Sequence, residues 1–157
     1  MTDIDQPFET VYTVDDYYDG PRSGVADFGG QPHFYRSLYL ETEEWNPDED
    51  RFELSPIPTE VRDLAVEDFR LWERWQVAER AGTISEWPEE AERVLPEDLP
   101  RHLAILEVLK SHLRINPEQR VVLQGEFFAG DRTGLQPGQL SPLTVRWKPI
   151  KSSNKTE

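Results

Sequence analysis

One acidic residue of this chain falls on the apolar side of an expected helix. Residues 60–81 are predicted to be helical, with Thr59 as the N-cap and Gly82 as the residue that ends the helix. Eight apolar side chains fill one half of its circumference: Val61, Leu64, Ala65, Phe69, Leu71, Trp72, Trp75 and Ala78. Asp68 lies inside that half. Because an unpaired carboxylate is costly among apolar groups, we expect Asp68 to find a partner or to take up a proton.

Two residues are candidate partners of Asp68. Arg36 is the leading one, because its expected strand face also carries apolar side chains. These are Phe34, Leu38 and Leu40. His102 is the other candidate, since it lies among the leucines of a second expected helix. The three residues could line a cleft in which Asp68 or His102 acts as a general base. The alternative, which we favour, is a buried pair that only holds helix against sheet.

A group of aromatic side chains near the N-terminus suggests a binding surface. If Phe34 faces the interior, His33, Tyr35 and Tyr39 point to the other side of the sheet. Exposed tyrosines bind partners well, because each ring covers a large area at a small entropic cost. We therefore expect a partner-binding surface made of Tyr17, His33, Tyr35 and Tyr39. Two alternatives remain: a loop covers this face, or the register is shifted by one residue, which exchanges the two faces.

Several kinds of chemistry are excluded by residue type or spacing. The chain has no cysteine, which excludes disulfides, thiolate metal sites and cysteine nucleophiles. Its three histidines lack zinc-ligand spacing, and the run from Asp15 to Gly20 lacks the pattern of a calcium loop. Neither a Gly-x-Ser-x-Gly elbow nor a glycine-rich phosphate loop is present. We expect no metal and no cofactor.

The charge of the chain is strongly negative and unevenly distributed. The net charge is −14, and residues 1–50 hold 13 acidic residues against only Arg22 and Arg36. Such a field repels nucleic acids and anionic membranes and attracts basic proteins. We therefore expect a basic protein as partner, and neither nucleic acid nor a membrane. The acidic N-terminus and the lack of a long apolar run predict a soluble, cytoplasmic protein. The sequence does not predict its oligomeric state.

The expected fold is α+β, with strands at both ends of the chain and helices between them. Alternating apolar residues and turn signals predict an N-terminal antiparallel β-meander over 8–55, including a Gly29-Gly30 hairpin. Two long helices, at about 60–81 and 99–115, should pack on one face of the sheet, with a short helix near 89–94.

A strand pair is expected at the C-terminus of the domain. Its strands span about 119–128 and 143–148, with Leu143, Val145 and Trp147 facing inward. Whether this pair joins the N-terminal sheet is left open. Residues 1–150 are expected to form one domain, and 151–157 a disordered tail.

A distinctive run of residues lies in the N-terminal third. It reads DYYDGPRSGVADF from Asp16 to Phe28 and PHFY from Pro32 to Tyr35. This run resembles the N-terminal motif of an uncharacterised family of small, acidic bacterial proteins. The resemblance implies a bacterial, cytoplasmic protein. It implies no activity, so no functional residue can be assigned from it.

These observations favour a binding role over catalysis. The acidic, tyrosine-rich N-terminal surface predicts a non-enzymatic cytoplasmic protein-binding domain, of the kind found in adaptor or immunity proteins. The alternative is a small hydrolase or isomerase that uses Asp68 and His102 in acid/base roles, with Arg36 nearby.

Overall fold

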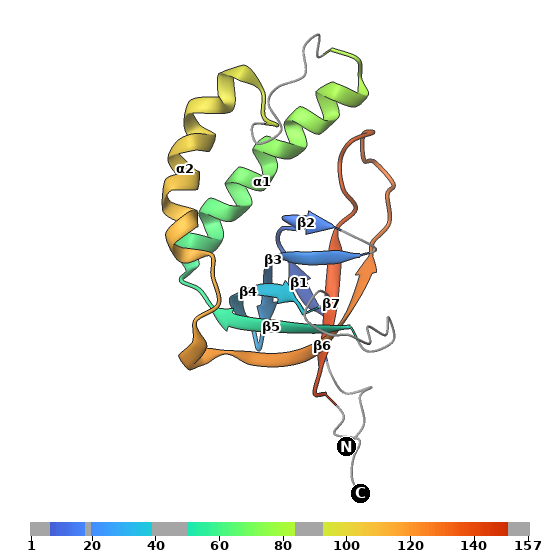
Figure 1. The fold of residues 1–157 in the computed structure, drawn as a ribbon. Coiled ribbons are helices and arrows are strands. Elements are labelled where there is room, and N and C mark those ends of the chain that lie inside the picture. The colour runs from blue at the N-terminus through green and yellow to red at the C-terminus, as the bar shows by residue number, and fades with distance from the viewer. Residues whose placement is uncertain (1–6, 18–19, 39–49, 84–92, 151–157) are drawn as a thin grey trace, which may run out of the picture.

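The computed structural model describes residues 7–17, 20–38, 50–83 and 93–150 (Figure 1). Two long helices, α1 (Thr59–Arg80) and α2 (Leu99–His112), lie between five N-terminal and two C-terminal strands. The strands are β1 (Glu9–Val11), β2 (Asp16–Tyr17), β3 (Pro21–Phe28), β4 (Gln31–Ser37), β5 (Arg51–Pro56), β6 (Val121–Ala129) and β7 (Leu143–Lys148). Short 3₁₀ turns, η4 (Pro96–Asp98) and η5 (Pro117–Gln119), lie before and after α2. The α+β class is confirmed.

The strands close into an antiparallel barrel. Their order is β1-β7-β6-β5-β4-β3, and β1 also pairs with β3 through Val11 and Ala26, which completes a ring of six strands. The two-residue strand β2 extends from the outer edge of β3. The C-terminal pair therefore belongs to the same sheet as the N-terminal strands, because it fills the gap between β5 and β1. The expected antiparallel strands are therefore present, and their closure into a barrel is a feature that the sequence did not predict.

Large side chains fill the barrel. The buried cluster inside it consists of Ala26, Tyr35, Phe52, Leu54, Val145 and Trp147. Val145 and Trp147 face inward, as their alternation with polar neighbours predicts. Gly125 leaves room for the indole of Trp147, since a Cβ atom at this position would lie 2.6 Å from the ring. The interior is a packed core.

The expected faces of β4 need correction. Tyr35 and His33 are 0% and 7% exposed, so neither lies on an open surface. Tyr35 points into the barrel, whereas Phe34 pairs with Val25 and packs toward the helices. The inner face of this strand is covered by the barrel interior, whereas on the outer face Phe34 packs toward the helices and Arg36 stays exposed. Because large aromatic side chains lie on both faces, the alternating pattern alone does not reveal which face is inside.

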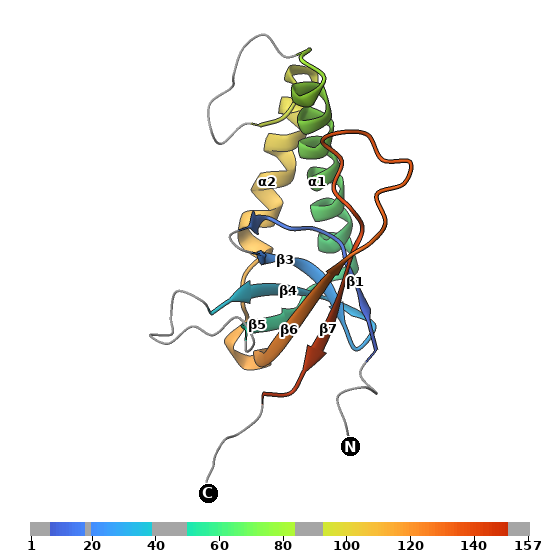
Figure 2. The ribbon, with the colours of Figure 1, turned by 90° about the vertical axis from the view of Figure 1, so that its right-hand side faces the viewer.

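The helical hairpin stands at one end of the barrel (Figures 1 and 2). Only the first turns of α1 and the last turns of α2 pack against the strands, so the expectation of helices lying on a sheet face holds for these turns alone. The shared cluster consists of Val25, Ile57, Val61, Ala65, Ile105 and Leu109. The rest of the hairpin extends beyond the barrel and is free to form one wall of a groove.

The ends of α1 follow local sequence signals. Gly82 has a φ of +75° and donates its N–H to the carbonyl of Glu79, while Thr83 donates to Ala78. This pair of hydrogen bonds is the Schellman ending that the glycine predicts. At the start, Pro58 occupies the N-cap position, and Thr59 is the first helical residue. The N-cap is therefore one residue earlier than expected.

Some expectations concern residues outside the described ranges. These are residues 89–92 of the short helix expected at 89–94, the side chains of Tyr39 and Leu40, and the tail at 151–157. The last two residues of that expected helix, Arg93 and Val94, are described and are not helical. In the described part of the chain, no helix combines the length and apolar composition that a membrane crossing requires.

Candidate functional site

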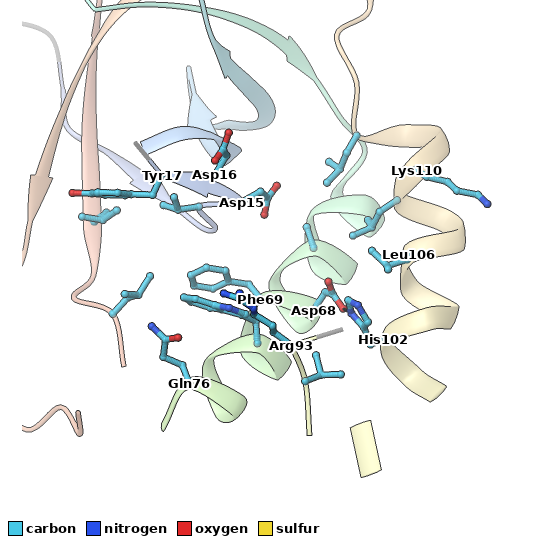
Figure 3. Close-up of a pocket in the computed structure, with 18 of the residues that line it drawn as sticks. Asp15, Asp16, Tyr17, Asp68, Phe69, Gln76, Arg93, His102, Leu106 and Lys110 are labelled. Atoms are coloured by element: carbon cyan, nitrogen blue, oxygen red, sulfur yellow. Dashed lines mark hydrogen bonds and ion pairs between the residues drawn. The ribbon is translucent and has the colours of Figure 1, made fainter. Parts of the chain in front are cut away.

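A groove separates the helical hairpin from the barrel (Figure 3). It has a volume of about 1330 Å³. Both helices, the segment around β2 and the loop between β6 and β7 contribute to its walls. Its apolar lining comes mainly from α1 and α2: Phe69, Trp72, Leu103, Leu106, Leu109 and Leu113. Leu103 and Leu106 are 45% and 37% exposed, so apolar area on this side of α2 is open to solvent.

Asp68 and His102 form a pair in the wall of this groove. His102 Nδ1 lies 2.6 Å from Asp68 Oδ1. Because an ionised carboxylate only accepts hydrogen bonds, Nδ1 carries the proton and donates it to Asp68. Burial raises the pKa of Asp68, and the hydrogen bond from His102 opposes that shift. The expectation that Asp68 finds a partner is confirmed, with His102 as that partner.

The pair belongs to a series of polar contacts that join α1 to α2 and to the turn η4 before it. Arg101 Nε lies 2.6 Å from Glu67 Oε2, and Arg74 Nε lies 3.0 Å from Asp98 Oδ2. These two contacts are on exposed surface, so each contributes little to stability. Asp68–His102 is the member of the series that lines the groove.

Arg36, the leading candidate partner of Asp68, pairs elsewhere. It lies opposite Glu53 in the β4–β5 register and contacts that carboxylate, with Arg36 Nε 2.6 Å from Glu53 Oε2. Arg120 binds the other oxygen of Glu53, also at 2.6 Å. Burial would raise the pKa of Glu53, but the hydrogen bonds from Arg120 and Arg36 hold that pKa below its usual value. The proposed cleft of Asp68, His102 and Arg36 is wrong, because the β4–β5 register pairs Arg36 with Glu53 and Arg36 does not line the groove.

The predicted tyrosine surface is not formed as expected. His33 and Tyr35 are buried, and Tyr39 lies outside the described residues. Tyr17 is 69% exposed and lines the groove. Of the residues in this prediction, Tyr17 alone is shown to be available to a partner.

Asp15 lies in the groove, although no motif in the sequence marks it as a functional residue. It lies on the barrel side of the hollow, opposite Asp68 (Figure 3). Asp15 as a whole residue is exposed, yet protein surrounds its carboxyl in the groove. This burial, together with repulsion from the Asp68 carboxylate, raises the pKa of Asp15 to about 6. The acidic run around residue 15 was a signal, but only the fold brings it to α1.

The loop between β6 and β7 forms a third wall and is attached to α1. Leu140 donates its N–H to the buried Glu73 carboxylate at 3.0 Å. Gly138 packs so closely that a Cβ atom there would lie 2.8 Å from the Gln76 backbone. Without a side chain at Gly138, the loop can lie directly against the helix.

The groove and its surroundings define a class by structure: an antiparallel barrel with a helical hairpin inserted between β5 and β6. No family model, curated protein or solved structure matches this chain. The resemblance of the N-terminal motif to small acidic bacterial proteins stays a prediction. In the ranges that the structure describes, no group of three or more acidic or histidine side chains is placed to hold a metal ion.

The raised pKa of Asp15 predicts a pH-dependent effect of Asp15→Asn. An aspartate in the unfolded chain ionises near pH 4, whereas Asp15 in the folded protein ionises near pH 6. Ionisation of Asp15 therefore lowers the stability of the folded protein as the pH rises from about 4 to above about 6. We expect Asp15→Asn to match the wild type at pH 4 and to be more stable at pH 7, by an amount that contact with water reduces. Denaturant unfolding at both pH values measures this, and a pH-independent difference would contradict it.

Proposed function

We propose that this chain is a non-enzymatic protein-binding domain whose groove takes a segment of a partner protein. The observation that carries the proposal is the open apolar wall of the groove, where Leu103 and Leu106 expose their side chains. Exposed apolar side chains that gather in a concavity are typical of binding sites. The acidic N-terminal surface expected from the sequence is replaced by a groove to which that segment contributes Asp15, Asp16 and Tyr17.

The size of the groove favours a polypeptide segment over a small molecule. Pockets for small ligands usually enclose about 300–1,000 Å³. The groove is larger, at about 1330 Å³, and it is open to solvent (Figure 3). A polypeptide segment can bury apolar side chains against α1 and α2 while its backbone stays near water.

Selection of short random peptides by display, followed by titration with purified protein, tests this function. We expect selected peptides to bind the wild type and to lose at least about tenfold in affinity for Leu106→Asp, because a charge would replace an apolar contact. Trp72 lines the groove, so tryptophan fluorescence can follow binding.

Val108→Asp is the matched control. Val108 and Leu106 both lie on α2 and are 38% and 37% exposed, but only Leu106 lines the groove. The Val108 variant should therefore bind the selected peptides as the wild type does. If no peptide is enriched, or if both variants lose affinity equally, the proposed function is wrong.

The alternative function is acid/base catalysis by Asp68 and His102. Their 2.6 Å contact suits a base whose ring is oriented by a carboxylate. The Nε2 atom, which would exchange the proton, is however buried. A general base must also pass its proton on to water after each turnover, and a buried Nε2 is poorly placed to do so, so the arrangement supports binding better than catalysis.

A further inference from the structure

We propose that the groove recognises a basic side chain of the partner segment, a lysine or an arginine flanked by apolar residues, between Asp15 and the Asp68–His102 pair. This inference rests on the proposed function and adds the chemistry that would select the partner. The two carboxylates face one hollow from opposite sides, Asp15 from the barrel and Asp68 from α1 (Figure 3).

The carboxylate of Asp15 has no cationic partner within the described ranges. No described lysine, arginine or histidine lies within salt-bridge distance of this carboxylate. The Asp68 carboxylate, in contrast, is close enough to repel it. Two carboxylates that repel each other across a groove attract a cation placed between them. An ammonium or guanidinium group would therefore relieve the repulsion that raises the pKa of Asp15.

His102 gives a second, independent indication of a ligand. The residue is 8% exposed and lines the groove, and its Nε2 has no hydrogen-bond partner among the described residues. Because Nδ1 donates to Asp68, a neutral ring leaves Nε2 as an acceptor. A buried acceptor without a donor is costly. The N–H groups of a lysine or arginine can donate to such an acceptor as well as to a carboxylate.

The cationic residues that line the groove are engaged with other groups. Lys110 binds Glu107 at 2.8 Å and points away from the hollow (Figure 3). Arg132 donates to Ser141 at 3.2 Å, and Arg93 lies over the ring of Trp75. The positive charge for Asp15 and Asp68 is therefore best supplied by the partner.

A pair of small probes tests this inference directly. n-Octylamine, protonated at pH 7, presents an alkyl chain and an ammonium group, as lysine does, and n-octanol is its neutral counterpart. We expect the amine to bind at least about tenfold more tightly than the alcohol, because the ammonium makes charge-assisted hydrogen bonds. Binding is measured by tryptophan fluorescence and by calorimetry with the full-length chain.

Two variants locate the preference. Asp15→Asn should remove most of the difference between amine and alcohol, whereas Asp63→Asn should retain it. Asp63 lies on the exposed side of α1, paired with Arg62, so the control removes the same charge away from the groove. Equal affinity of the two probes, or no binding by either, would overturn the inference. So would a preference that Asp15→Asn leaves intact.

The failures of the two proposals can be told apart. Selected peptides that respond to Leu106→Asp but contain no basic residue would support the groove as a binding site and exclude the basic side chain. An absence of selected peptides, with octylamine still preferred through Asp15, would instead contradict the polypeptide partner while retaining the cation site.

Discussion

Replacement of Tyr35 by alanine is expected to lower the free energy of unfolding by about 3–5 kcal/mol, the usual cost of removing a large buried ring. Tyr35 is fully buried in the barrel. Its ring centroid lies 5.9 Å from that of Phe52, 5.5 Å from Phe127 and 6.0 Å from Trp147. No neighbour can fill the space, because these rings are themselves held by the strands. Chemical denaturation followed by circular dichroism measures the loss.

Tyr35→Phe is the matched control for this prediction. It keeps the ring and removes only the hydroxyl, which donates to the Thr13 carbonyl at 3.1 Å. The expected loss is about 1 kcal/mol, the net contribution of one hydrogen bond. If Tyr35→Ala changed the free energy of unfolding by less than about 0.5 kcal/mol, as surface substitutions do, the placement of Tyr35 inside the barrel would be wrong. The exposed tyrosine surface expected from the sequence would then be correct.

Replacement of Gly24 by alanine is expected to cost about 3 kcal/mol, at the upper end of the range for overpacking. A Cβ atom at this position would lie 2.2 Å from the Thr13 carbonyl oxygen and 2.8 Å from the Tyr35 hydroxyl. The first of these atoms belongs to the backbone and cannot rotate away. Nearby, Tyr12 and Thr13 donate to the Val25 carbonyl, where the chain after β1 meets β3. The substitution should therefore disrupt the pairing of β1 with β3, which closes the barrel.

Gly30→Ala separates this steric effect from the general effect of replacing a glycine. Gly30 lies in the β3–β4 turn with a φ of +78°, and nothing lies within 4 Å of a Cβ atom built there. Alanine in this left-handed conformation costs about 1–2 kcal/mol. Thermal and denaturant unfolding should show a clearly larger loss for Gly24→Ala. Equal losses would mean that β1 and β3 do not approach so closely.

The Asp68–His102 pair shows what a local pattern can predict. Each residue lies on the apolar side of its own helix, and a 3.6-residue repeat is enough to place it there. Two amphipathic helices in one small domain pack with these sides together, so the two polar exceptions meet. Periodicity therefore makes His102 a candidate partner of Asp68, and only the structure decides for His102 over Arg36.

Arg36 and Tyr35 show where local patterns are insufficient. In an alternating strand, the choice of inner face depends on which face carries the apolar residues, and β4 has Phe34 on one side and Tyr35 on the other. Each face carries a large aromatic side chain, so the pattern does not distinguish them. The partner of Arg36 depends on the β4–β5 register, which places Glu53 directly opposite. Cross-strand partners are neighbours in space and not in sequence.

Helices, turns and the alternating C-terminal strand could be inferred from the residues, because their signals act within a few positions of the chain. Gly82 ends α1, and Val145 and Trp147 face inward, for such local reasons. Closure of the barrel, and the approach of Asp15 to Asp68 across the groove, depend on contacts between distant segments. Backbone hydrogen bonds between strands are the same for every side chain, so the residues do not reveal which strands will pair.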